Sequence, residues 1–317
     1  MKKRIEWIDI AKGIGIFLMV CGHTSIPEFL SNFIWMFHMP LFFIISGILY
    51  VYPKNGIIGG VKKRFRSLVI PYFFFLFISL LYRFLAHEEI PMSIFTWGDK
   101  VYALWFLQVM FFAQIFYIII NKYIKRNTIK VCLVTSISLF GYAFYQKSIH
   151  FPYRLEVTCL ALFFYGFGDI LKEQLIRLKI DNLRVLFLLL TTFVYSFFVP
   201  RLDMADNNYG SYIPNLVGAC LGSVAVISLS KSNIFGYIYC LYIKQFLLWA
   251  GKNSLVILGL SPILNMSIKF ILLNFHLPFH IRFLAQHTIL WIMLYGLSYI
   301  LTKYTPFFVG KKINDSW

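Results

Sequence analysis

The sequence has few charged residues for its length. Charged side chains make up 14% of 317 residues, and acids are the scarcest, with 13 Asp and Glu against 30 Lys and Arg. Hydrophobic residues reach 59%, whereas soluble domains have roughly 45–50% apolar and about 25% charged residues. This balance excludes an ordinary soluble domain and predicts a polytopic membrane protein.

Several motifs are also missing. The five cysteines show no CxxC spacing and give no reason to expect a disulfide framework. There is no Gly-rich phosphate loop, no serine nucleophile elbow and no nucleic-acid motif. His276, His280 and His287 have a spacing that fits no established zinc pattern, so we expect no metal. The first apolar segment lacks a small-residue cleavage site and carries Asp9 and Lys12, so we expect it to be a span and not a cleaved signal peptide.

Hydrophobic runs recur along the whole chain and predict one all-α membrane domain over residues 1–317. We expect about ten spans, near 8–24, 31–51, 67–85, 101–121, 130–146, 156–172, 182–199, 212–230, 245–272 and 284–304. The loops on the side of the N-terminus hold far more Lys and Arg than the loops between them. The positive-inside rule therefore predicts both termini in the cytoplasm, and a net charge of +17 that reflects topology and not nucleic-acid binding.

The first span carries ionisable side chains at positions where lipid would favour none. Asp9, Lys12 and His23 lie in or beside the run Trp7 to Thr24. Lys12 and His23 are 11 residues apart, which on a helix is three turns plus about 20°, or roughly 16 Å along the axis. They therefore share one helix face. An ionisable group at membrane depth usually marks function, although a histidine bonded to a carbonyl for packing is the alternative.

The second span contains Phe37-His38-Met39-Pro40, and the connection before it is short. The two helices should be antiparallel neighbours, with His38 at about the level of His23. Pro40 should kink the helix and free a carbonyl. His38 then has three possible roles: orienting His23, binding substrate, or satisfying that carbonyl. After this span a basic loop, Lys62 to Arg66, suits phosphates, but it is equally well explained as a topological signal.

These features together resemble the acyltransferase-3 family of integral-membrane acyltransferases, and its fucose 4-O-acetylase-like branch in particular. The resemblance rests on these stretches in order: Lys12 to His23, Phe37 to Phe42 with Ser46-Gly47, the basic loop before Pro71-Tyr72, Leu104 to Leu107, Glu156, and Gly251 to Leu255. Two departures stand out. The family's first basic position is commonly arginine, and a histidine often follows the Asn253-Ser254-Leu255 stretch, where this chain has leucine and glycine.

The resemblance implies an O-acetyltransferase of the cell membrane that moves acetyl from acetyl-CoA, bound on the cytoplasmic side, to a sugar hydroxyl of an envelope or exported glycan. Such a reaction needs a base or an acyl carrier, and histidine suits either role. We expect His23 to act, assisted by His38 and Glu156. Lys12, Arg64, Arg66 and Trp105 are then the candidates for binding the donor.

Each assignment has a plainer alternative. Glu156 could be a rim carboxylate paired with Arg154, and Lys12 could pair with Asp9 one turn away. Trp105 could be an interfacial anchor or a core aromatic. The rivals for the whole chain are acylation of a small molecule, and a glycan or lipid transporter whose path is lined by the same buried charges.

Overall fold

The computed structural model describes residues 5–98, 101–237 and 240–311. These residues form helices and no strand, and the β-structure among them is one isolated bridge between Asp203 and Asn208. The all-α prediction is confirmed. The helices are α1 Glu6–Gly22, α2 Glu28–Ile48, α3 Gly56–Arg64, α4 Ile70–Leu85, α5 Ser93–Thr96, α6 Trp105–Tyr123, α7 Asn127–Gln146, α8 Leu155–Ile170, α9 Lys172–Arg177, α10 Asn182–Tyr195, α11 Tyr212–Lys231, α12 Leu241–Lys252, α13 Ser254–Leu273 and α14 Phe279–Tyr304.

Seven helical stretches in the described ranges are long and apolar enough to cross a bilayer. They are α2, the run from α3 through α4, α6, α7, α11, α13 and α14. The predicted count of about ten is therefore not confirmed. The other three predicted spans correspond to α1, α8 and α10, which have 17, 16 and 14 residues. A straight helix needs about 20 apolar residues to cross the hydrocarbon core, so these three are short for a full crossing.

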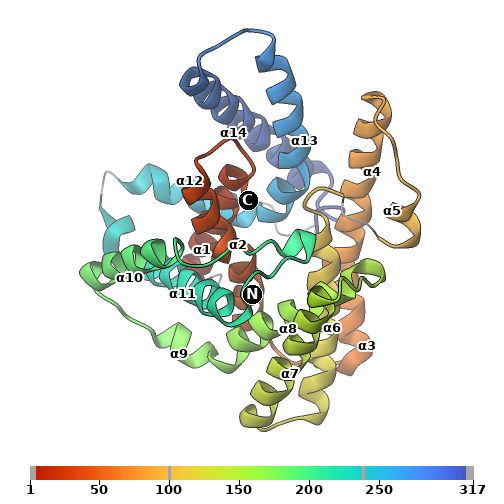
Figure 1. Cartoon of the computed structure of the whole chain (residues 1–317), viewed down its shortest axis with the longest axis vertical. Coiled ribbons are helices and arrows are strands. Elements are labelled where there is room, and N and C mark those ends of the chain that lie inside the picture. The colour runs from red at the N-terminus through yellow and green to blue at the C-terminus, as the bar shows by residue number, and fades with distance from the viewer. Residues whose placement is uncertain (1–4, 99–100, 238–239, 312–317) are drawn as a thin grey trace.

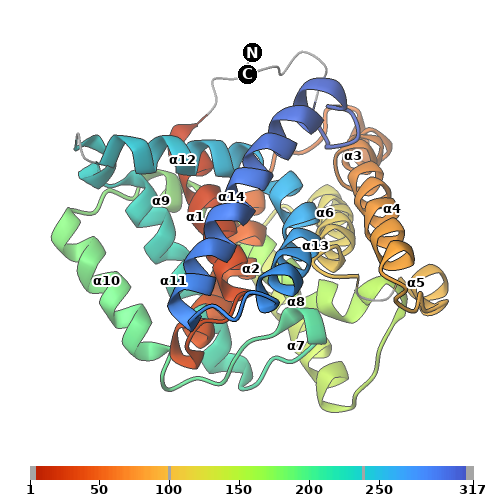
Figure 2. The same cartoon turned by 90° about the horizontal axis from the view of Figure 1, so that it is seen from above.

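The helices form a bundle with two distinct faces (Figures 1 and 2). One face holds the turn between α1 and α2 and the connection between α10 and α11, and we call it the turn face. The opposite face holds the start of α1, the end of α14 and the helix α12, which runs across it in Figure 2. We call this the α12 face. Figure 1 looks onto the turn face.

Two predicted boundaries are wrong. The basic stretch Lys62 to Arg66 is not a loop: α3, a π-helical turn at Phe65–Val69 and α4 form one helical run from Gly56 to Leu85. The predicted ninth span is not one helix either. It breaks at Asn253 into α12 and α13, and Asn253 donates its side-chain amide to the Trp249 carbonyl (2.9 Å) at that break. Local hydrogen bonding by Asn competes with helix continuation.

Glycines allow the central helices to approach closely. A Cβ added to Gly13 of α1 would lie 2.1 Å from the Leu247 carbonyl oxygen of α12, and one on Gly251 would lie 1.8 Å from the Asp9 carbonyl oxygen. Small residues bring helix backbones together in membranes, where dispersion contacts replace the hydrophobic effect. The α1–α12 crossing therefore fixes the position of the first helix.

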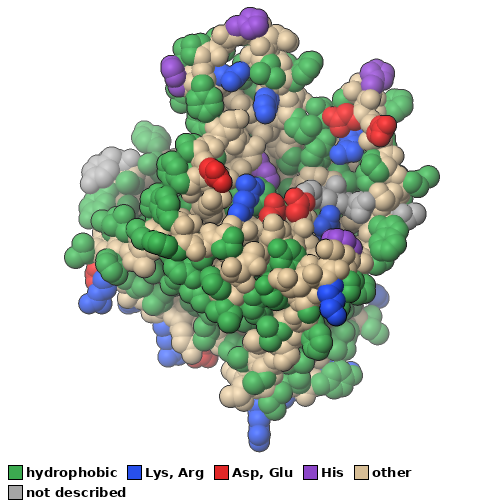
Figure 3. All heavy atoms as spheres, in the orientation of Figure 1, with side chains coloured by type: hydrophobic (Ala, Val, Ile, Leu, Met, Phe, Trp, Pro, Cys, Tyr) green, Lys and Arg blue, Asp and Glu red, His purple; other side chains and the backbone are tan. Residues whose placement is uncertain are grey.

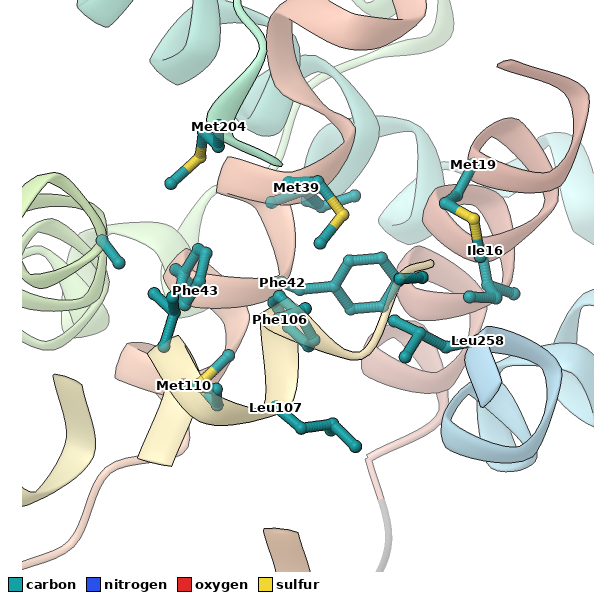
Figure 4. Packing of buried hydrophobic residues seen from close by; sticks show 14 of the residues in the cluster. Ile16, Met19, Met39, Phe42, Phe43, Phe106, Leu107, Met110, Met204 and Leu258 are labelled. Atoms are coloured by element: carbon teal, nitrogen blue, oxygen red, sulfur yellow. The ribbon is translucent and has the colours of Figure 1, made fainter. Parts of the chain in front are cut away.

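An apolar layer fills the middle of the bundle (Figure 4). Ile16 and Met19 of α1 pack in the same buried cluster as Met39 and Phe42 of α2 and Leu258 of α13. These side chains lie between the two ends of α1, and so between Lys12 and His23. The close packing of this layer separates the turn face from the α12 face.

Candidate active site

A cavity of about 580 Å³ opens on the turn face. It is lined by residues of α1, α2, α6 and α13, by the turns that follow α1 and precede α6, and by the segment 201–206 between α10 and α11. In Figure 3, charged side chains of both signs surround a hollow near the middle of this face. The lining includes three of the predicted site residues, His23, His38 and Trp105. This volume falls in the range of small-molecule sites.

His23 lies at the mouth of this cavity. It follows directly after α1, as the residue that caps the helix C-terminus, and its side chain is exposed. Its ring packs edge-on against the indole of Trp35, with 5.1 Å between the ring centroids. The ring is therefore open to a ligand in the cavity and is not enclosed by aliphatic neighbours.

His38 lies deeper and is buried, one helical turn further along α2 from Trp35. Its Nδ1 lies 2.9 Å from the carbonyl oxygen of Ile34. A carbonyl only accepts hydrogen bonds, so Nδ1 carries the proton and the neutral ring keeps Nε2 as an acceptor. Pro40 would free the carbonyl of Met36, four residues earlier, and not that of Ile34. The structure therefore shows His38 bonding a different carbonyl, and leaves its Nε2 available to accept a proton.

Trp35 links the two histidines. Its indole ring lies 5.1 Å from the His23 ring and 5.4 Å from the His38 ring, centroid to centroid. The indole N–H donates to the Gly22 carbonyl oxygen (3.2 Å), which holds α2 against the end of α1. The guanidinium of Arg201 lies 3.8 Å from the centroid of the same indole. Arg201 thus brings a permanent positive charge into the cavity beside both imidazoles.

Polar contacts from α13 and α14 hold the turn that carries His23. Asn265 donates its side-chain amide to the His23 carbonyl oxygen (3.1 Å), and Gln286 donates to the Asn265 side-chain oxygen (2.6 Å). The next residue in the turn, Thr24, lies 3.1 Å from Nε2 of His287. Because Thr24 Oγ1 donates to the Cys21 carbonyl, it accepts from that nitrogen. Through Asn265, α13, which is the second half of the predicted ninth span, supports the turn that carries His23.

Glu156 does not line the cavity. It is buried in the first turn of α8, where it accepts the backbone N–H of Phe151 (3.0 Å) and lies 3.7 Å from Nδ1 of His150. Arg154, its expected rim partner, donates instead to the carbonyl oxygen of Ala205, a cavity-lining residue. The catalytic role of Glu156 therefore stays a prediction, and its contacts here support the segment at 150–154.

The predicted donor-binding cations are dispersed. Lys12 is half-buried on α1, on the far side of the apolar layer from His23. Arg64 is half-buried and lines a separate hollow of about 560 Å³ together with Lys54 and Lys63. The Nε of Arg64 is buried and has no hydrogen-bond partner among the described residues. Arg66 is exposed on the same helical run. Neither Lys12 nor Arg66 lines the hollow that Arg64 lines.

Sequence reasoning missed Trp35, Arg201 and Asn265. Trp35 is three residues before His38, which places it on the same helix face, so a helical-wheel count would have found it. Arg201 lies in a polar connection that resembles any topological loop in sequence. Asn265 follows Pro262 by three residues within an apolar run, and an amide at such a position is a usable signal.

Among the residues that the structure describes, no group of three or more His, Cys, Asp or Glu is arranged to hold a metal ion. No curated protein and no solved structure matches the chain. The model of the acyltransferase-3 family, described as an acyltransferase domain, matches residues 5–305. With nearly the whole chain covered by that match, this membrane protein belongs to the acyltransferase-3 family and is an acyltransferase.

Proposed function

We propose that the protein is an O-acetyltransferase that moves acetyl from acetyl-CoA, held at the α12 face, to a sugar hydroxyl in the cavity of the turn face. The turn face is then extracytoplasmic and both termini are cytoplasmic, as the basic loops predict. The observation that carries the proposal is the convergence of His23 and His38 on one indole in an open cavity, within a chain of an acyltransferase family.

The lining of the cavity suits a sugar. Trp35, Tyr102 and Trp105 offer aromatic surfaces for the apolar faces of a pyranose ring. Asp203 and Asn265 offer oxygen and amide groups for hydroxyls. This combination of aromatic walls with a few polar groups is typical of sites that orient a small polar ligand. It supports a glycan acceptor.

The imidazoles supply the chemistry. In the base route, one imidazole takes the hydroxyl proton as the sugar oxygen attacks the thioester carbonyl, the C–S bond breaks, and the proton passes to the leaving thiolate. In the carrier route, a ring nitrogen of His23 attacks the thioester carbonyl and the C–S bond breaks to release the thiolate of coenzyme A. The sugar oxygen then attacks the acetyl carbon, the C–N bond to His23 breaks, and the hydroxyl proton passes to a neighbouring base. The acceptor lone pair on His38 Nε2 serves the proton transfer in either route, and the positive charge of Arg201 stabilises the oxyanion that develops on the thioester carbonyl.

The donor has to reach His23 from the other side of the apolar layer. The face of α1 between Lys12 and His23 presents Ile16 and Met19, and Met19 and Met39 form the floor of the cavity. Methionine is unbranched and adapts its shape readily. We infer that the two methionines move aside to admit the thioester, with Lys12 engaging the phosphates of coenzyme A.

A transfer assay in proteoliposomes tests the proposal. In this assay, labelled acetyl-CoA is supplied on one side of the vesicle membrane only. A separate comparison of the surface glycans of cells with and without the protein, by mass, identifies the acetylated sugar. His23→Ala should lower transfer by roughly 10²–10⁴-fold, the usual contribution of a positioned acid–base group. His276→Ala, at an exposed histidine outside the cavity, is the matched control. Full transfer by His23→Ala, with unchanged thermal stability, would remove the assignment.

A further inference from the structure

A second hollow lies beside the cavity on the turn face. It measures about 730 Å³ and lies between α4 and α13. Its walls are mostly apolar, and Leu85 and Phe270 are 68% and 72% exposed in it. Figure 1 shows α4 and α13 diverging toward this side of the molecule, and Figure 3 shows the surface indented there. We call this hollow the α4–α13 groove.

The groove adjoins the cavity at one shared residue. Met266 of α13 lines both hollows. Tyr102 lines the cavity, and the guanidinium of Arg83 lies 5.4 Å from its ring centroid. Arg83 directly follows Tyr82, which lines the groove. A molecule with one end in the cavity can therefore extend into the groove past Met266.

A cation lies within the groove. Lys269 lines it and is exposed, and no ion pair joins it to any residue in the described ranges. It comes three residues after Met266, so both side chains lie on one face of α13. The carboxylate of Glu88 also lines the groove, and it pairs with the guanidinium of Arg83, 3.8 Å away. The groove therefore offers an apolar surface together with one available positive charge near its junction with the cavity.

We propose that the acceptor sugar reaches this enzyme on a lipid anchor, through a phosphate link. The apolar chain lies in the α4–α13 groove, the phosphate lies at Lys269 next to Met266, and the sugar occupies the cavity beside His23. The charge of Lys269 favours this occupant over a neutral lipid, and the continuity of the two hollows favours it over a free sugar, which has no use for the groove. The inference rests on the proposed function, since it names the class of its acceptor.

The first test measures binding alone, without acetyl-CoA. The probe is a photoactivatable polyprenyl monophosphate in phosphatidylcholine nanodiscs, with crosslinked peptides mapped by mass. We expect labelling at residues 82–86 and 266–273, and Lys269→Gln should lower its yield roughly tenfold, the effect of losing about 1.4 kcal/mol of charge pairing. Lys303→Gln, an exposed lysine on α14 outside the groove, is the control. Equal competition by phosphatidylglycerol would make the groove an ordinary lipid site and overturn the proposal.

The second test measures transfer to two forms of one acceptor, a prenyl-phosphate-linked hexose and the methyl glycoside of that hexose. Phe270→Ser should raise KM for the linked form about five- to thirtyfold, the equivalent of roughly 1–2 kcal/mol of lost apolar contact, and leave the methyl glycoside unchanged. Phe187→Ser on α10, where the phenyl ring is also 72% exposed, is the matched control. An equal rise for both acceptors overturns the proposal. Transfer to neither form, with specific labelling in the first test, refutes the acetyltransferase function and leaves the groove assignment standing.

Discussion

The two ends of α1 differ in how completely their surroundings are assembled. At the turn face, side chains from α1, α2, α13 and the 201–206 segment converge on one cavity around His23. At the α12 face, Lys12 lies on α1, whereas Arg64 and Arg66 belong to a separate helical run, and Arg64 lines a separate hollow. Under the proposed function, the acceptor site is thus a formed cavity, whereas the cations proposed for the donor lie on two separate helical runs.

The apolar layer lies between the cavity at the turn face and the dispersed cations at the α12 face, and so separates the two regions. Met19 and Met39 close the cavity floor, and Ile16, Phe42 and Leu258 pack around them (Figure 4). A membrane enzyme that joins a thioester from one side to a hydroxyl on the other must keep water and ions from crossing between turnovers. Under the proposed function we infer that the packed layer provides that seal. The comparison predicts larger effects from substitutions at the turn face than from those at the α12 face.

After His23, the largest effect is expected at His38. His38→Ala removes the acceptor Nε2 from the cavity and should lower kcat by roughly 10²–10³-fold, in the range of general-base loss. Steady-state kinetics with purified protein measures it. Met36→Leu, a volume-conserving change at a buried neighbour on α2, is the control and should change kcat less than about twofold. A His38→Ala enzyme with wild-type kcat would reduce His38 to a packing residue.

Part of the arrangement at the turn face could be predicted from the sequence. His23 and His38 could be placed near each other because a helix period and a short connection determine their levels. Arg201 could not be placed there, since it comes more than 160 residues later, in a segment whose folding back over the cavity depends on tertiary contacts such as the Arg154 bond to the Ala205 carbonyl. Long-range packing of loops carries no local periodic signal.

The errors in the fold have similar causes. The basic stretch at 62–66 has the charge of a loop, but it continues as a helix because α3 and the π-helical turn pack against α6. The ninth span has the hydrophobicity of one helix, but it breaks because Asn253 bonds back to Trp249 and accepts from Nζ of Lys311 (2.7 Å). Hydropathy reports which residues prefer lipid and is insensitive to where a backbone turns.

A tenfold effect is expected at Lys12. Lys12→Gln should raise KM for acetyl-CoA about tenfold, the loss of roughly 1.4 kcal/mol of phosphate pairing, while KM for the acceptor stays unchanged. Lys12→Arg keeps the charge, adds the guanidinium fork and should retain most of the affinity. Initial rates over a range of donor concentrations give the answer. An unchanged donor KM in Lys12→Gln would separate Lys12 from donor binding.

A smaller effect is expected at Asn265. Asn265→Leu keeps the branching at Cγ but removes the N–H that donates to the His23 carbonyl, so the turn carrying His23 loses one contact. The loss of one neutral hydrogen bond, about 1 kcal/mol, predicts a roughly fivefold fall in kcat with both KM values unchanged. Thr302→Ala, whose hydroxyl donates to the Ser298 carbonyl within α14, is the control. A change confined to thermal stability would indicate that Asn265 supports the fold and not His23.

The smallest effects are expected at the α12 face, where the cations are dispersed. Arg66 is exposed, and a single screened surface charge contributes at most about 1 kcal/mol, so Arg66→Gln should change the donor KM by no more than about fivefold. Arg64 differs because its buried Nε has no partner among the described residues, and such a group costs free energy until a ligand satisfies it. Arg64→Gln should therefore raise the donor KM more than Arg66→Gln does. The reverse order, measured under the same conditions, would show that the donor approaches along the exposed face of the helical run and not through the hollow that Arg64 lines.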